Sequence, residues 1–144
     1  MLINITYANK ETDKQIADVV GRPYTLIEKI RMRGVGTSKM QIVEADEKMA
    51  ELLNISVDTK YCYFELRTKG LIIGFQSILK TYVWVIPFYS LSIYYNGGLL
   101  SIYSNTDFMK VKKPFYGSVD KKYLKKVLDC KAKYFEESDF RNEE

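Results

Sequence analysis

Hydrophobic residues in the first 56 positions recur at the three- and four-residue spacing of amphipathic helices. A first helix is predicted from Thr12, which has Gln15 at capping-box spacing, to Gly21, a residue that can end a helix with a positive φ. A second helix is predicted after Thr25, where the capping-box spacing is repeated, and a third within "EADEKMAELLNI". We therefore expect a helical N-terminal segment over residues 1–56.

From Lys60 the hydrophobic spacing shortens to two residues, which is the period of a half-buried strand. Six β-rich runs follow one another: "YCYFELR", "LIIGF", "TYVWVI", "YSLSIYY", "LLSIYS" and "DFMKVK". Gly97 and Gly98 supply the positive φ that a tight hairpin needs between the fourth and fifth runs, and Pro87 predicts a bend or an edge. Short successive runs of this kind predict an antiparallel meander sheet or partial barrel of about six strands.

The last periodic run predicts a C-terminal amphipathic helix that begins at Ser118 as N-cap, with Asp120 in the first turn. Its apolar face contains Tyr123, Leu124, Val127, Leu128 and Phe135. We expect Leu124 and Val127 to be buried against the open side of the sheet. The whole chain is thus predicted to be an α+β protein with three parts: the helical segment 1–56, the sheet and helix 57–136, and a frayed acidic tail 137–144.

The arrangement of the second part has a family resemblance. "YFELRTKGLIIGF", followed by "VIPFYSLSIY", a hairpin and the final helix, resembles a small bacterial pleckstrin-homology-like domain over residues 57–136. A complete barrel of that family has one strand more than the six runs. The resemblance implies a domain that binds lipids, peptides or other proteins and does not usually catalyse. It implies no ligand residues, because no basic phosphoinositide motif aligns.

The first two predicted helices also resemble a helix-turn-helix over residues 12–33. Ala17 is the small residue where two helices approach closely, and Ile27 and Ile30 would anchor the second helix beneath the first. The basic residues Lys29, Arg31 and Arg33 would then face DNA phosphates or base edges. The structural alternative is a packing corner, because two capped helices that meet at a glycine also pack well.

The excess of positive charge lies in the second part of the chain. The net charge is +4, and residues 57–135 hold thirteen Lys or Arg against five Asp or Glu. Lys121, Lys122, Lys125 and Lys126 lie opposite the apolar face of the last helix, as a solvated face or as a surface for an anionic partner. Strand aromatics could line a ligand pocket or a protein-binding face, or simply pack the sheet. They are Tyr61, Tyr63, Tyr82, Trp84, Tyr94 and Tyr103. Among them, Tyr82 and Trp84 are the predicted binding residues.

The composition argues against catalysis. The chain has no His, which removes the usual general base and the commonest metal ligand, and its two Cys residues, Cys62 and Cys130, are predicted to be buried free thiols. Neither a metal nor a cofactor is expected. The start shows no secretion signal, and the longest apolar stretch is too short to span a bilayer, so a cytoplasmic location is expected. The sequence predicts a non-catalytic binding protein for a protein or an anionic surface, with a small DNA-binding regulator as the alternative.

Overall fold

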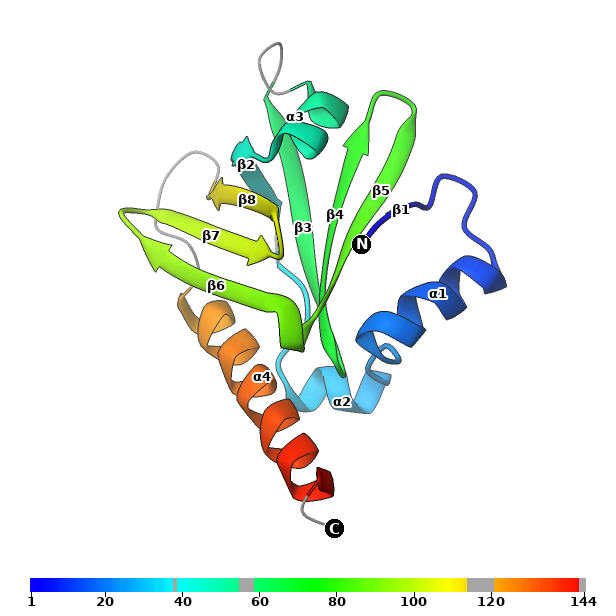
Figure 1. Cartoon of the computed structure of the whole chain (residues 1–144), viewed down its shortest axis with the longest axis vertical. Helices are drawn as coiled ribbons and strands as arrows, with labels where there is room; N and C mark the ends of the chain where they lie inside the picture. Colours follow the sequence, from blue (N-terminus) through cyan, green and yellow to red (C-terminus); the bar gives the residue numbers. More distant parts are fainter. Residues whose placement is uncertain (38, 55–58, 114–120, 143–144) are drawn as a thin grey trace.

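The fold is one antiparallel sheet with helices on both of its faces (Figure 1). The computed structural model describes residues 1–37, 39–54, 59–113 and 121–142. Within these residues eight strands form a sheet with the order β1-β5-β4-β3-β2-β8-β7-β6. The strands are β1 (Leu2–Asn4), β2 (Met40–Ala45), β3 (Lys60–Arg67), β4 (Gly70–Ser77), β5 (Lys80–Pro87), β6 (Leu91–Asn96), β7 (Leu99–Ser104) and β8 (Asp107–Lys112). The predicted α+β class is confirmed, but the sheet has eight strands where six were expected.

The sheet bends after β5. Pro87 ends this strand and precedes a short 3-10 helix, Phe88–Ser90, so that β6 and β7 run across the direction of β3, β4 and β5 (Figure 1). A main core fills the space inside the bend, where it includes Phe64, Phe75 and Trp84. The predicted hairpin is confirmed, because Gly97 and Gly98 have φ of 60° and 85° between β6 and β7.

The two strands that the sequence analysis missed both lie in the segment 1–56. β1 is a short edge strand beside β5, whereas β2 lies inside the sheet, hydrogen-bonded to β3 on one side and β8 on the other. Met40 and Ile42 of β2 are buried in the main core. The described part of the segment 1–56 therefore contains two strands besides its three helices, and one of these strands is central to the sheet.

The N-terminal helices are α1 (Lys10–Val20), α2 (Leu26–Arg31) and α3 (Glu47–Leu53). α1 begins earlier than predicted, since Asn9 is its N-cap and accepts the backbone N–H of Thr12; the predicted cap at Thr12 is wrong. Gly21 ends α1 with a φ of 82°, as expected. The capping box of α2, between Thr25 and Glu28, is confirmed.

α1 packs on the outer face of the sheet and forms a second, smaller core. Ile16 and Val20 of α1 contact the outward side chains of Ile72, Val83 and Val85. This explains the unbroken apolar run of β4, since its odd-numbered side chains face the main core and Ile72 faces α1. α1 covers only part of the outer face, and the rest stays open.

The C-terminal helix α4 (Lys121–Asn142) closes the other side of the bend. Its predicted cap, Ser118 and Asp120, lies outside the described residues. Tyr123 and Val127 are buried, and the Tyr123 hydroxyl donates to the Val35 carbonyl at 2.9 Å. Leu124, Cys130 and Tyr134 are partly buried beside them. The predicted apolar face is wrong at Leu128 and Phe135, which are exposed, and the helix continues through residue 142 where a frayed tail was expected.

Candidate ligand-binding site

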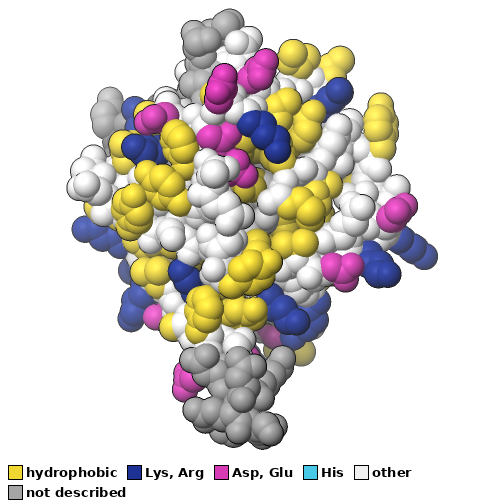
Figure 2. Space-filling model, viewed as in Figure 1, with side chains coloured by type: hydrophobic (Ala, Val, Ile, Leu, Met, Phe, Trp, Pro, Cys, Tyr) yellow, Lys and Arg dark blue, Asp and Glu magenta, His cyan; other side chains and the backbone are white. Residues whose placement is uncertain are grey.

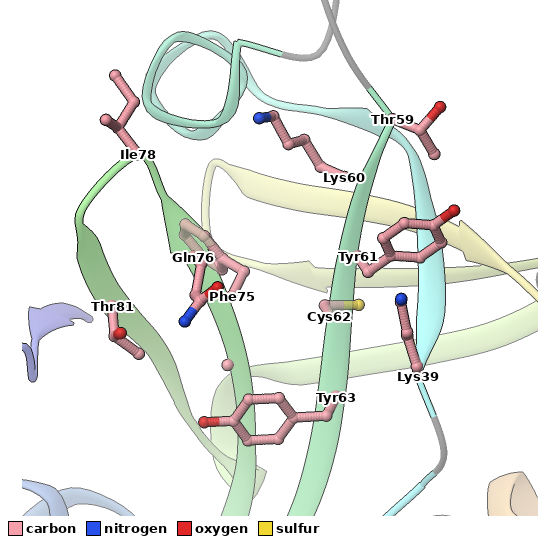
Figure 3. Close-up of a pocket in the computed structure, with 11 residues that line it drawn as sticks. Lys39, Thr59, Lys60, Tyr61, Cys62, Tyr63, Phe75, Gln76, Ile78 and Thr81 are labelled. Atoms are coloured by element: carbon pink, nitrogen blue, oxygen red, sulfur yellow. The ribbon is translucent and has the colours of Figure 1, made fainter.

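An open hollow of about 630 Å³ lies on the outer face of β3 and β4, in the part that α1 leaves uncovered (Figure 3). Its size is in the range of small-molecule sites. The hydrogen-bond register places its polar side chains, because Gln76 pairs with Thr81 and Tyr63 pairs with Gly74. The lining residues are Lys39, Thr59, Lys60, Tyr61, Cys62, Tyr63, Gly74, Phe75, Gln76, Ile78 and Thr81.

The floor of the hollow is made by Tyr63 and Gly74. The Tyr63 side chain points from β3 toward β4 (Figure 3), and its ring end lies over Gly74. A Cβ atom at Gly74 would lie only 2.2 Å from the Tyr63 Cζ atom. Tyr63 nevertheless remains 45% exposed. The glycine therefore lets the ring lie close to the backbone of β4 while much of the side chain stays in contact with solvent.

Two positively charged side chains of the described residues line the hollow. Lys39 and Lys60 are its charged lining residues, and the Lys39 Nζ atom lies 4.0 Å from the centre of the Tyr61 ring. The nearby carboxylate of Glu65 is held by Arg67 at 2.7 Å. Partial burial, and then the charge of Glu65, raises the pKa of Tyr63, so that its ring is neutral at neutral pH.

The lysines predicted on the last helix do not all face solvent in the same way. Lys121 and Lys125 are exposed, as is Lys122, and the Lys121 Nζ atom lies 5.2 Å from the centre of the Tyr95 ring. Lys126 instead donates to the Gly34 carbonyl at 2.9 Å, and Lys131 donates to the Leu91 carbonyl. Part of the positive charge of α4 therefore ties the helix to the rest of the molecule.

The two predicted aromatic candidates pack in the sheet. Trp84 is 1% exposed within the main core, and its Nε1 atom has no hydrogen-bond partner among the described residues. Tyr82 is partly buried and stacks on Phe75, with ring centres 5.9 Å apart. Trp84 is thus not accessible to a ligand at the surface, in contrast to Tyr63 on β3, which is 45% exposed.

A second groove, of about 560 Å³, lies between α2 and α4. Both signs of charge line it, including Arg31, Lys133, Asp129 and Glu137. The guanidinium of Arg22 binds Glu28 through two hydrogen bonds of 2.7 and 3.0 Å. This contact, together with the backbone of Thr25, lowers the pKa of Glu28 to about 2.

α2 presents its apolar side chains to solvent. Ile27 and Ile30 were expected beneath α1, yet they are 63% and 67% exposed, and Leu26 in the same helix is 74% exposed. Arg31 and Arg33 are exposed and Lys29 is partly exposed, with Arg31 beside α4 in the second groove. The anchoring prediction for Ile27 and Ile30 is wrong, whereas DNA binding itself stays a prediction.

Two further aromatic or apolar surfaces occur. Tyr94, Tyr103 and Phe108 stack in a row across β6, β7 and β8, with successive ring centres 5.5 and 5.9 Å apart. Hydrophobic side chains also gather on the left of Figure 2, over this part of the sheet. The turn between β4 and β5 exposes Ile78 and Leu79 by 86% and 89%. Of these residues, only Ile78 contributes to the hollow.

Sequence reasoning found part of the hollow and missed the rest. Tyr61 and Tyr63 were among the aromatic candidates, and their spacing of two residues places them on one face of β3. Lys39, Gln76 and Thr81 were missed, since each comes from a different segment and only the strand register brings them together. The glycine inside "LIIGF" was the available signal, because a glycine in a strand often marks a close approach.

The described residues contain no group of three or more His, Cys, Asp or Glu side chains placed to hold a metal ion. Cys62 and Cys130 are free thiols, the first buried and the second partly buried, and burial raises the pKa of both. No helix in the described part of the chain has the length and apolar character needed to cross a membrane. Comparison of the chain with protein-family models, with curated proteins and with solved structures finds no match.

Proposed function

We propose that this chain is a binding module with a pleckstrin-homology-like sheet, working by binding and not by catalysis, and that its ligand carries negative charge. The observation that carries the proposal is the hollow on β3 and β4, whose charged lining residues are both lysines. Positive charge beside aromatic side chains attracts anionic ligands and orients them.

The pleckstrin-homology-like part of the proposal is supported by β2. The six β-rich runs were one strand short of that family's barrel, and β2 supplies a seventh strand between β3 and β8. α4 packs on the main core through Tyr123 and Val127, in keeping with the single closing helix of the resemblance. A cytoplasmic location belongs to the same proposal.

The hollow suits an anion better than the lysine face of α4 does. Lys39 makes no ion pair with a described carboxylate, and its Nζ atom is placed by the Tyr61 ring. On α4 the ammonium of Lys126 already donates to a backbone carbonyl, and Asp129 follows Lys125 by one helical turn. An anion at α4 would therefore meet a mixed surface.

The test is titration calorimetry with inorganic tripolyphosphate as the probe. We expect binding that weakens as salt is raised and that falls about tenfold in Lys39→Gln, because one charged contact is removed. The matched control is Lys121→Gln with Lys125→Gln, which removes two exposed charges from α4 and should leave the affinity nearly unchanged.

Two results would contradict the proposal. Absence of tripolyphosphate binding at low salt would reject an anionic ligand altogether. Loss of binding in the α4 variant, with normal binding in Lys39→Gln, would reject the hollow and move the site to the lysine face.

A further inference from the structure

The Tyr63 ring has the properties of a stacking surface. Its outer end rests over Gly74, so the backbone of β4 supports the ring. It is open to solvent along the hollow, since 45% of the residue is exposed. An aromatic ring held on a sheet with an accessible side binds planar ring systems by stacking.

A positive charge, that of Lys39, lines the same hollow as the Tyr63 ring. Tyr61 and Tyr63 are two residues apart on β3 and so share the outer face. Lys39 immediately precedes Met40, which pairs with Cys62, so the lysine lies level with this part of β3. The Tyr61 ring, 4.0 Å from the Lys39 Nζ atom, holds the ammonium in place.

Polar groups on the opposite side complete the hollow. Gln76 and Thr81 pair in register across β4 and β5, and both line the hollow. Neither side chain donates or accepts a hydrogen bond with another described residue. The backbone of Thr81 is already satisfied, because its N–H donates to Thr6 Oγ1 at 2.9 Å and its carbonyl accepts from Ile5. The Gln76 amide and the Thr81 hydroxyl therefore remain able to bond the polar edge of a ligand.

We propose that the hollow binds a free nucleotide, with its base stacked on Tyr63, its phosphate held by Lys39 and its base edge bonded by Gln76 and Thr81. The nucleotide proposal rests on the proposed function, because it specifies which anionic ligand the hollow binds. A nucleotide combines a planar ring, a polar edge and a negatively charged group. The hollow offers a separate binding group for each of these three features. The volume of about 630 Å³ suits one nucleotide.

The experiment compares AMP with two probes that each lack one part of it. Ribose 5-phosphate lacks the base, and adenosine lacks the phosphate. By titration calorimetry AMP is expected to bind about tenfold or more tightly than ribose 5-phosphate, because base stacking adds to the phosphate contact. Adenosine is expected to bind more weakly than AMP and with little dependence on salt.

Variants assign the roles within the hollow. Tyr63→Leu should lower the affinity for AMP about tenfold and leave that for ribose 5-phosphate unchanged, whereas Tyr63→Phe, which keeps the ring, should bind AMP normally. Gly74→Ala should act like Tyr63→Leu, since its Cβ displaces the ring. Tyr94→Leu is the matched control, because Tyr94 is equally exposed but lies on β6. Circular dichroism establishes that each variant is folded.

Failure of this inference is distinguishable from failure of the proposed function. If tripolyphosphate binds through Lys39 but AMP binds no more tightly than ribose 5-phosphate, the nucleotide is wrong and the anionic ligand stands. Normal AMP binding in folded Tyr63→Leu would also overturn the stacking role. A single-stranded oligonucleotide that binds where AMP does not would replace a free nucleotide by a nucleic acid.

Discussion

Ile78 has a backbone conformation that β-branched residues rarely adopt. Its φ is 49°, in the left-handed region, at the two-residue turn where Ser77 pairs with Lys80. The side chain is 86% exposed and gains little from packing. A left-handed conformation costs roughly 1–2 kcal/mol for a residue with a Cβ, and asparagine or glycine tolerates it better.

Replacing Ile78 should therefore stabilise the protein. We expect Ile78→Asn to raise the free energy of unfolding by about 1 kcal/mol, measured by denaturant titration. Leu79→Asn is the control, because Leu79 is equally exposed but does not have a positive φ. A loss of stability in Ile78→Asn would mean that the isoleucine side chain contributes more at the rim of the hollow than its backbone conformation costs.

α4 offers a matched pair of neighbouring residues for testing how it docks. Val127 is completely buried in the main core, whereas Leu128 is 43% exposed. Val127→Ala should destabilise the protein by about 2 kcal/mol, because it removes buried methyl groups and leaves a cavity. Leu128→Ala should change stability by less than about 0.5 kcal/mol. Equal effects in thermal or chemical unfolding would show that α4 is rotated from the orientation described.

Two features that depend on local sequence alone were predicted correctly. The capping box at Thr25 and the glycine pair at Gly97 and Gly98 act through bonds and dihedral angles within a few residues, so their sequence is sufficient. β2 was missed because six residues between helix-like stretches give a weak alternation, and its partners in β3 and β8 lie far along the chain. The formation of β2 thus depends on pairing with distant strands, which the local sequence pattern does not reveal.

The faces of the helices show a different limit of sequence reasoning. Periodicity established that α2 has an apolar side, but not that another element covers it, and Leu26, Ile27 and Ile30 are in fact exposed. The hollow shows the same limit, since alternation placed Tyr61 and Tyr63 on one face while Lys39 joined them only through the pairing of β2 with β3. Which side chains from separate segments lie together can be predicted only when the strand register is known.

Because β2 lies inside the sheet, truncation at the two ends of the chain should affect stability differently. A chain that ends at Ser104 lacks β8 and α4, leaving β2 with one neighbouring strand and the main core without Met109, Val111 and Val127. Removal of residues 1–5 takes away an edge strand, the outer contacts of Ile3 and Ile5, and the partly buried Leu2 at the margin of the main core. We expect the first truncation to abolish cooperative unfolding and the second to lower stability but retain it, as followed by circular dichroism on heating.

During synthesis β2 emerges well before its partner strand β8. Residues 40–45 leave the ribosome well before residues 107–112, and at about 5–20 residues per second the delay between β2 and β8 is several seconds. During this delay one edge of β2 has no strand to pair with, and an unpaired edge is a template for pairing with other chains. The nascent protein consequently completes its sheet only after residue 112 has emerged, and its tendency to aggregate should be greatest before that point.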